Sequence, residues 1–240
     1  MSAPVVDAVA LGEFLGRSES ALEPGQLARI SGKLGERARW ARAGGAWGDW
    51  NVLFSLAPAT RRLPAEERAG WQERLSPVAP LLAAGDAAGA LDEILSWQDR
   101  PDWLIDWTTF WLHLAAPEHP WWARWIYAAQ PNTGAMPLLL TEPGGLTAGD
   151  VRGIYEQLAE GWQFLGSVLV SLRRLLEVEE PERPLVALSL VYGTYLYTLA
   201  SWRLSEEFTA VLGPVAQVLE GLLGIRRWEA MRIGAQGQVD

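Results

Sequence analysis

Apolar residues recur at three- and four-residue steps along most of the chain, which is the period of an α-helix. The clearest stretch lies between residues 151 and 178, where the apolar positions are Ile154, Leu158, Trp162, Leu165, Leu169, Leu172 and Leu176. This pattern predicts a helix of about 28 residues, roughly 40 Å long at the usual rise per residue. Pro181 and Pro184 follow it and are expected to end it.

A second long segment, Leu185–Trp202, carries no charged residue. It is nearly long enough to span a bilayer, but serines, threonines, a glycine and three tyrosines interrupt its apolar run. We therefore expect a buried central helix and no membrane span. The connection to the preceding helix is short and polar, so the two helices are predicted to pack antiparallel.

The remaining chain predicts shorter helices and no strand. Pro77 and Pro80 interrupt what would otherwise be one long helix, and Ser205 is expected to cap another. The predicted shorter helices are Val5–Arg17, Gln26–Arg42, Trp47–Leu56, Ala65–Leu75, Asp86–Trp97, Asp102–Ala115 and Trp121–Gln130.

The predicted fold class is therefore all-α, with about nine to eleven helices and a long antiparallel C-terminal pair in one compact domain. Residues 1–130 would form an N-terminal helical subdomain, and residues 151–240 a long-helix bundle. Residues 131–150 form a Pro/Gly-rich loop, unusually long for a compact domain. This loop is interpreted as a lid, a partner arm or a hinge.

Composition excludes several function classes. The chain contains no cysteine, which excludes disulfides, a thiolate nucleophile and a Cys-ligated metal. Its net charge of −9 argues against non-specific nucleic-acid binding. The N-terminus lacks a basic region and carries Asp7 and Glu13, so we expect no signal peptide and a cytoplasmic protein.

One predicted helix carries both acids and aromatic residues. Asp102 and Asp106 lie one turn apart, a spacing at which two carboxylates can share a divalent cation. Neighbouring positions on the helix would place an aromatic wall beside them, formed by Trp103, Trp107 and Trp111.

This five-residue motif, "DWLID", resembles the acidic helices of isoprenoid synthases. The resemblance implies Mg²⁺, a diphosphate substrate and a second acidic helix, for which the nearest residues are Glu156 and Glu160. The structural alternative is that the acids stabilise a helix N-terminus and the tryptophans form the core. The two histidines, His113 and His119, do not share a helical face and are interpreted as structural. Common nucleotide, metalloprotease and hydrolase motifs are absent from the sequence.

Tryptophan and arginine also gather in two stretches, "RARWARAGGAWGDW" and "HPWWARWIYAAQ". These are the residue types that dominate interface hot spots. The leading hypothesis is a non-enzymatic interaction or assembly protein, with a protein partner or a homo-oligomer. The alternative is a helical enzyme or small-molecule binder with Mg²⁺ and the tryptophan-lined pocket. The predicted interaction residues are Arg37, Arg39, Trp40, Trp47, Trp50, Trp121, Trp122 and Trp125.

Overall fold

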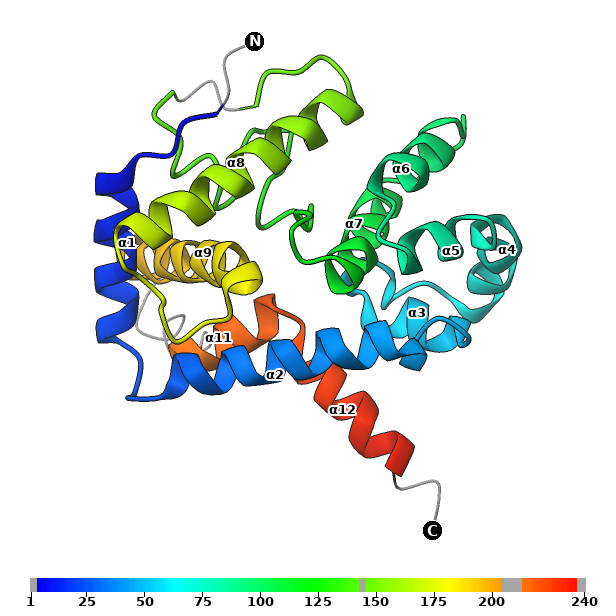
Figure 1. Ribbon diagram of the computed structural model, residues 1–240, viewed down its shortest axis with the longest axis horizontal. Coiled ribbons are helices and arrows are strands. Elements are labelled where there is room, and N and C mark those ends of the chain that lie inside the picture. Colours follow the sequence, from blue (N-terminus) through cyan, green and yellow to red (C-terminus); the bar gives the residue numbers. More distant parts are fainter. Residues whose placement is uncertain (1–3, 143–145, 204–212, 237–240) are drawn as a thin grey trace. The chain divides into compact units, whose positions relative to one another are not determined.

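The computed structural model describes residues 4–142, 146–203 and 213–236. Within these ranges the regular elements are eleven α-helices and three short 3₁₀ or π turns, without a strand, which confirms the all-α class (Figure 1). The helix predicted to begin at Ser205 lies outside the described residues.

The elements follow one another in this order: α1 (Ala8–Ser20), α2 (Gln26–Trp40), η1 (Ala41–Gly45), α3 (Trp50–Leu56), η2 (Pro58–Thr60), α4 (Ala65–Leu75), α5 (Val78–Ala83), α6 (Ala87–Leu95), α7 (Trp103–Ala115), α8 (Val151–Ser171), η3 (Glu180–Glu182), α9 (Arg183–Arg203), α11 (Val215–Leu222) and α12 (Ile225–Gln236).

The chain divides into two compact units, each built from two separate stretches of sequence. Unit 1 comprises Met1–Leu34 and Arg124–Leu223, and unit 2 comprises Gly35–Ala123 and Gly224–Asp240. The boundary between Leu34 and Gly35 falls within α2. The predicted division into segments 1–130, 131–150 and 151–240 stays a prediction.

Unit 1 is built around α9, which contacts α1, α8, α11 and η3. Every residue from Leu185 to Val191 is fully buried, whereas Tyr192 and residues 194–199 are partly buried. The first half of the uncharged segment is therefore buried at the centre of unit 1, as its composition predicts. α8 packs against it, while the antiparallel sense of the pair stays a prediction. In the ranges that the structure describes, no helix combines the length and the apolar content needed to cross a membrane.

Unit 2 is built around α7, which contacts α5, α6, η1 and η2. All side chains from Trp107 to Leu114 are buried, including those of Thr108, Thr109 and His113. A helix buried on nearly every side needs apolar residues all round, which explains why α7 has no clear polar face.

Aspartates begin several of these helices. Asp7, Asp49, Asp86 and Asp150 each accept hydrogen bonds from backbone N–H groups in the first turns of α1, α3, α6 and α8. Because the first four N–H groups of a helix lack intrahelical partners, such a carboxylate stabilises the start of the helix. Asp49 explains why α3 begins at Trp50 and not at the predicted Trp47.

The predicted helix Trp121–Gln130 is wrong, because this stretch forms turns. Its backbone groups bond to residues other than their helical neighbours. In unit 2, the backbone N–H of Trp122 donates to Oγ1 of Thr109 at 2.9 Å. In unit 1, Ala128 and Thr133 exchange backbone hydrogen bonds of 2.7 and 3.1 Å. These bonds, one to α7 and two within a local turn, satisfy groups that a helix would otherwise pair.

The predicted helix over 151–178 is also wrong at its end, because α8 stops at Ser171, before either proline. The N–H of Arg173 donates to the carbonyl of Val170, and that of Arg174 to the carbonyl of Leu169, both at 3.0 Å. This pair of hydrogen bonds is a Schellman motif, which needs a residue with a left-handed backbone conformation directly after the helix. Arg173 takes that conformation with a φ of 51°, although glycine is the usual residue there.

Candidate interaction surface

Two of the tryptophans predicted to line a pocket belong to the interior of unit 2. Trp107 and Trp111 are both fully buried. Each donates its indole N–H to the carbonyl of Leu53 at 3.0 Å. Leu53 is one of the last four residues of α3, whose carbonyls have no partner within the helix. The two indoles therefore cap α3 and fill the core.

Trp103, the third of these tryptophans, lies in a different environment. It is only partly buried, and its ring meets Trp71 of α4 edge to face, with centroids 5.1 Å apart. Trp71 in turn stacks on Trp97, with centroids 6.3 Å apart and planes inclined by 29°. All three indoles are partly exposed to solvent.

An exposed arginine completes this group. The guanidinium carbon of Arg74 lies 4.9 Å from the ring centroid of Trp71 and 4.7 Å from that of Trp97. Both distances are within the range of a cation–π contact. We call Trp71, Arg74, Trp97 and Trp103 the Trp71–Arg74 cluster.

The cluster is held in place by local contacts. Trp71 and Arg74 lie three residues apart on α4, so they share one face of that helix. The indole N–H of Trp97 donates to the carboxylate of Glu93 at 3.3 Å. Sequence reasoning placed Trp71, Arg74 and Trp97 in no predicted site, and Trp103 only in the alternative pocket. The three-residue spacing on α4 is a signal for Arg74, whereas the position of Trp97 depends on tertiary packing.

The acids of α7 do not fit the Mg²⁺ site that the isoprenoid-synthase resemblance implies. Asp102 is exposed, and Asp106 accepts a hydrogen bond from the indole N–H of Trp121 at 2.7 Å. The proposed second pair, Glu156 and Glu160, is exposed on α8 in unit 1. Among the described residues, no three His, Asp or Glu side chains are grouped to hold a metal ion.

The two histidines lie near each other in unit 2. His113 is buried, and its Nδ1 is 2.9 Å from the backbone oxygen of His119. Burial lowers the pKa of His119 below its ordinary value of 6.5; Glu118 opposes this shift and His113 adds to it. This contact between His113 and His119 holds the turn that follows α7 in place.

The eight predicted interaction residues differ in how deeply their side chains are buried. Arg37 is fully buried with its guanidinium 5.8 Å from the ring centroid of Phe110, and Trp121 is 1% exposed. Neither lies on the surface of the protein, so we omit both from the proposed surface. Arg39 is exposed, as the prediction requires. The remaining five, Trp40, Trp47, Trp50, Trp122 and Trp125, are partly buried.

Several of these five are fixed by other rings. Trp47 meets Trp111 edge to face at 5.3 Å, and Trp50 lies 6.0 Å from Phe54, both within unit 2. Trp125 belongs to unit 1, where its ring lies 6.1 Å from that of Tyr192. The predicted residues therefore do not form a single patch on one unit.

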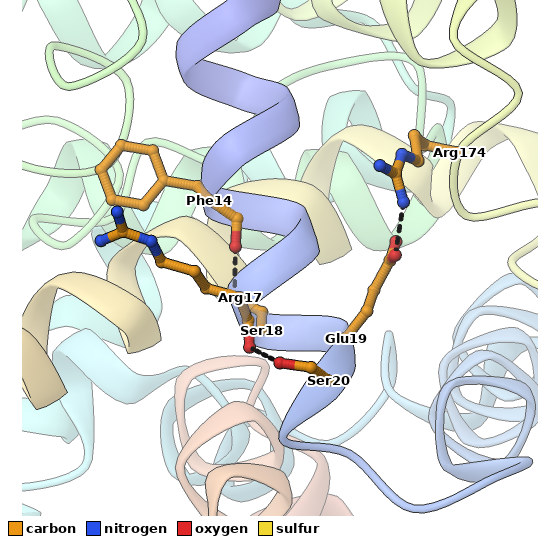
Figure 2. A network of polar contacts seen from close by, with 6 residues as sticks. All are labelled: Phe14, Arg17, Ser18, Glu19, Ser20 and Arg174. Carbon is orange, nitrogen blue, oxygen red and sulfur yellow. Dashed lines mark hydrogen bonds and ion pairs between the residues drawn. The ribbon is translucent and has the colours of Figure 1, made fainter.

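Two open clefts near the end of α1 are lined by described residues of unit 1. One has a volume of about 480 Å³ and is lined by Leu22, Leu27 and Leu176, together with Glu19 and Arg174. These last two residues form an ion pair at 2.8 Å, which Figure 2 shows. The pair joins α1 to the turn that follows α8.

The second cleft has a volume of about 350 Å³ and is rich in hydroxyl groups. These hydroxyls already have partners inside the protein. Ser18 bonds the carbonyls of Phe14 and Leu190 at 3.0 and 3.1 Å, and the hydroxyl of Tyr197 donates to the carbonyl of Gly213. They hold the helices together, which leaves few polar groups to orient a ligand.

No family model, curated protein or solved structure matches this chain. We therefore infer the function from the arrangement of the residues in this chain.

Proposed function

We propose that this protein is a non-enzymatic interaction or assembly protein that binds a protein partner through the Trp71–Arg74 cluster. The observation that carries the proposal is the position of Arg74, whose guanidinium lies over two partly exposed indoles. Tryptophan and arginine dominate interface hot spots because they bury a large area and still offer polar groups.

The fixed geometry of the cluster supports the same proposal. A side chain that is already immobilised loses little conformational entropy on binding. Trp97 is held by Glu93, and Trp71 is held between the rings of Trp97 and Trp103. These indoles therefore suit a binding role better than freely rotating side chains would.

The chemistry of the cluster indicates what kind of partner fits it. The indoles offer apolar faces, and the guanidinium of Arg74 offers N–H donors that suit a carboxylate. A partner surface with an apolar side chain beside an Asp or Glu satisfies both. Unit 2 also exposes Arg39 and Arg42 near the partly buried Trp40, which form a second candidate contact area. A cytoplasmic location remains part of this proposal.

No comparable observation supports the alternative of an enzyme or small-molecule binder. Its pocket needs Trp107 and Trp111 to face a cavity, but both bond Leu53 within the core. Its metal needs Asp106, which bonds Trp121. We therefore do not extend the proposal to catalysis.

A matched pair of charge reversals tests the proposal. Arg74→Glu removes the cation from the cluster, and Arg62→Glu makes the same charge change at another exposed arginine of unit 2. Protein purified gently from its own host would be weighed intact by native mass spectrometry, and the partner found would then be titrated against each variant.

We expect Arg74→Glu to weaken binding about 30-fold, which corresponds to a hot spot of about 2 kcal/mol. Arg62→Glu should change the affinity by less than about threefold, as expected for a charge outside the interface. Equal effects of the two substitutions, or full retention of the partner by Arg74→Glu, would exclude the cluster as the binding surface.

A further inference from the structure

The larger cleft of unit 1, with a volume of about 480 Å³, lies between residues 19–27 and residues 173–177. Its volume lies within the range of sites that hold small organic molecules. Leucine side chains from both stretches line it, and Leu176 among them is 57% exposed. The cleft therefore offers apolar surface to the aliphatic part of a ligand.

Five charged side chains also line this cleft, and three of them already have a partner within the protein. Glu19 and Arg174 form the ion pair at 2.8 Å that Figure 2 shows. The carboxylate of Glu23 lies 4.0 Å from the guanidinium of Arg29, which is outside the cleft. These contacts balance the charges of the three residues.

The other two charged side chains, Arg173 and Glu177, remain available to a ligand. Both residues are exposed. In the part of the chain that the structure describes, neither side chain forms an ion pair or a hydrogen bond with another residue. The cleft thus presents one available cation and one available anion beside its apolar surface.

The turn between these two residues also offers backbone donors. The N–H of Val178 donates to the carbonyl of Leu175 at 3.0 Å and closes the turn. The N–H groups of Leu176 and Glu177, at its centre, donate to no acceptor among the described residues. Guanidinium groups and backbone N–H groups are both donors that bind carboxylates. A carboxylate therefore finds donors of two kinds on this side of the cleft.

The backbone on the same side is held in an unfavourable conformation. Arg173 and Leu175 have φ angles of 51° and 53°, in the left-handed region that residues with a side chain rarely adopt. The side chain of Leu175 is buried, and its burial supports the turn. Conformations of this kind gather where proteins bind ligands. The strain therefore points to the same turn as the available charges do.

We propose that this cleft binds a small aliphatic zwitterion, either a free amino acid such as leucine or a short peptide of such residues. Arg173 and the N–H groups of the turn bind its carboxylate, and Glu177 binds its ammonium group. Leu22, Leu27 and Leu176 cover its aliphatic part. Because contacts between exposed charges are weak on their own, this apolar contact supplies the rest of the binding energy.

The two available charges decide the class of ligand. An acid without an amino group would lie near the carboxylate of Glu177, and an amine without a carboxylate would lie near the guanidinium of Arg173. Like charges repel, whereas a zwitterion pairs with both residues. The cleft belongs to unit 1 and the Trp71–Arg74 cluster to unit 2, so either proposal can fail while the other holds.

A matched set of ligands tests the proposal on the full chain by titration calorimetry. Leucine and leucyl-leucine carry both charges, N-acetylleucine lacks the ammonium group, and leucinamide lacks the carboxylate. We expect a zwitterion to bind about tenfold more tightly than either of the last two compounds. Tighter binding of leucine would identify a free amino acid, and tighter binding of leucyl-leucine a peptide. No binding of either zwitterion, or equal binding of N-acetylleucine or leucinamide, would overturn the proposal.

Three variants test the residues of the cleft. Glu177→Gln removes the available anion, and Glu180→Gln is its matched control, because Glu180 is an exposed acid that does not line the cleft. Arg173→Gly removes the available cation and keeps the fold, since glycine adopts the left-handed conformation without strain. Thermal unfolding checks that the fold is kept.

We expect Glu177→Gln and Arg173→Gly each to weaken binding of the zwitterion about tenfold. Glu180→Gln should change the affinity by less than about twofold. Equal affinities of Glu177→Gln and Glu180→Gln, or wild-type affinity in folded Arg173→Gly, would refute the site.

Discussion

At the scale of single residues, one residue type serves three purposes in this protein. Trp107 and Trp111 fill the core and cap α3 through the carbonyl of Leu53. Trp121 is buried and bonds the carboxylate of Asp106. Trp71 remains partly exposed beneath Arg74. The partner of each indole, and not the local sequence pattern, determines its role.

Trp107 and Trp111 share the carbonyl of Leu53 as their acceptor. The losses of unfolding free energy caused by replacing each of them should therefore not add. Trp107→Phe or Trp111→Phe alone leaves one indole N–H on that oxygen, so each should cost about 1–2 kcal/mol of unfolding free energy. The double variant leaves a buried carbonyl without a donor and should cost about 1 kcal/mol more than the sum. Urea unfolding of the four proteins measures the coupling, and strict additivity would contradict the shared bond.

The lowered pKa of His119 predicts a loss of stability in mild acid. Burial disfavours the charged imidazole in the folded state, so the unfolded chain binds a proton more readily below its ordinary pKa of 6.5. The contribution of His119 is present above that pH and is lost as the pH falls. The urea midpoint should therefore drop more between pH 8 and pH 5.5 for the wild type than for His119→Gln. Equal drops would show that His119 is not the group responsible.

At the scale of elements, α8 shows how local bonds fix the two ends of a helix. Asp150 accepts a hydrogen bond from the N–H of Gly153 at 2.7 Å and begins the helix. Arg173 ends it by taking a left-handed conformation. The turn that follows buries Leu175 and Val178 in unit 1. Burial of these two side chains favours the early end over a longer helix.

The start of α8 gives a simple prediction. Asp150→Ala removes the cap and should destabilise the protein by about 1 kcal/mol. Asp150→Asn keeps an oxygen acceptor and should cost much less. Thermal or urea unfolding separates the two variants. If they are equally destabilised, the carboxylate acts through its charge and not as a cap.

At the scale of the whole molecule, the helical period predicts the fold class well. The bounds of Ala65–Leu75 agree with α4, because Pro64 precedes this helix and Pro77 follows it. The burial of residues 185–191 also follows from the sequence, because an uncharged stretch interrupted by hydroxyl groups suits a protein interior.

Other features depend on contacts that no local pattern contains. Trp121–Gln130 has a helical composition, but its backbone bonds to Thr109 and to the stretch around Thr133. The sequence predicts that Arg37 lies on the surface, yet its side chain is fully buried near Phe110. The cluster that we propose as the binding surface brings together residues from α4, from beyond α6 and from α7. Local sequence patterns do not show that these residues come together.

An interaction or assembly function is tested first by the native mass of this protein, purified gently from its own host. We expect a mass above 26.4 kDa, raised either by a second copy of the chain or by a different protein. A partner that is lost with Arg74→Glu and kept with Arg62→Glu would identify the Trp71–Arg74 cluster as the contact. A bare monomer at cellular concentration would contradict an interaction or assembly function.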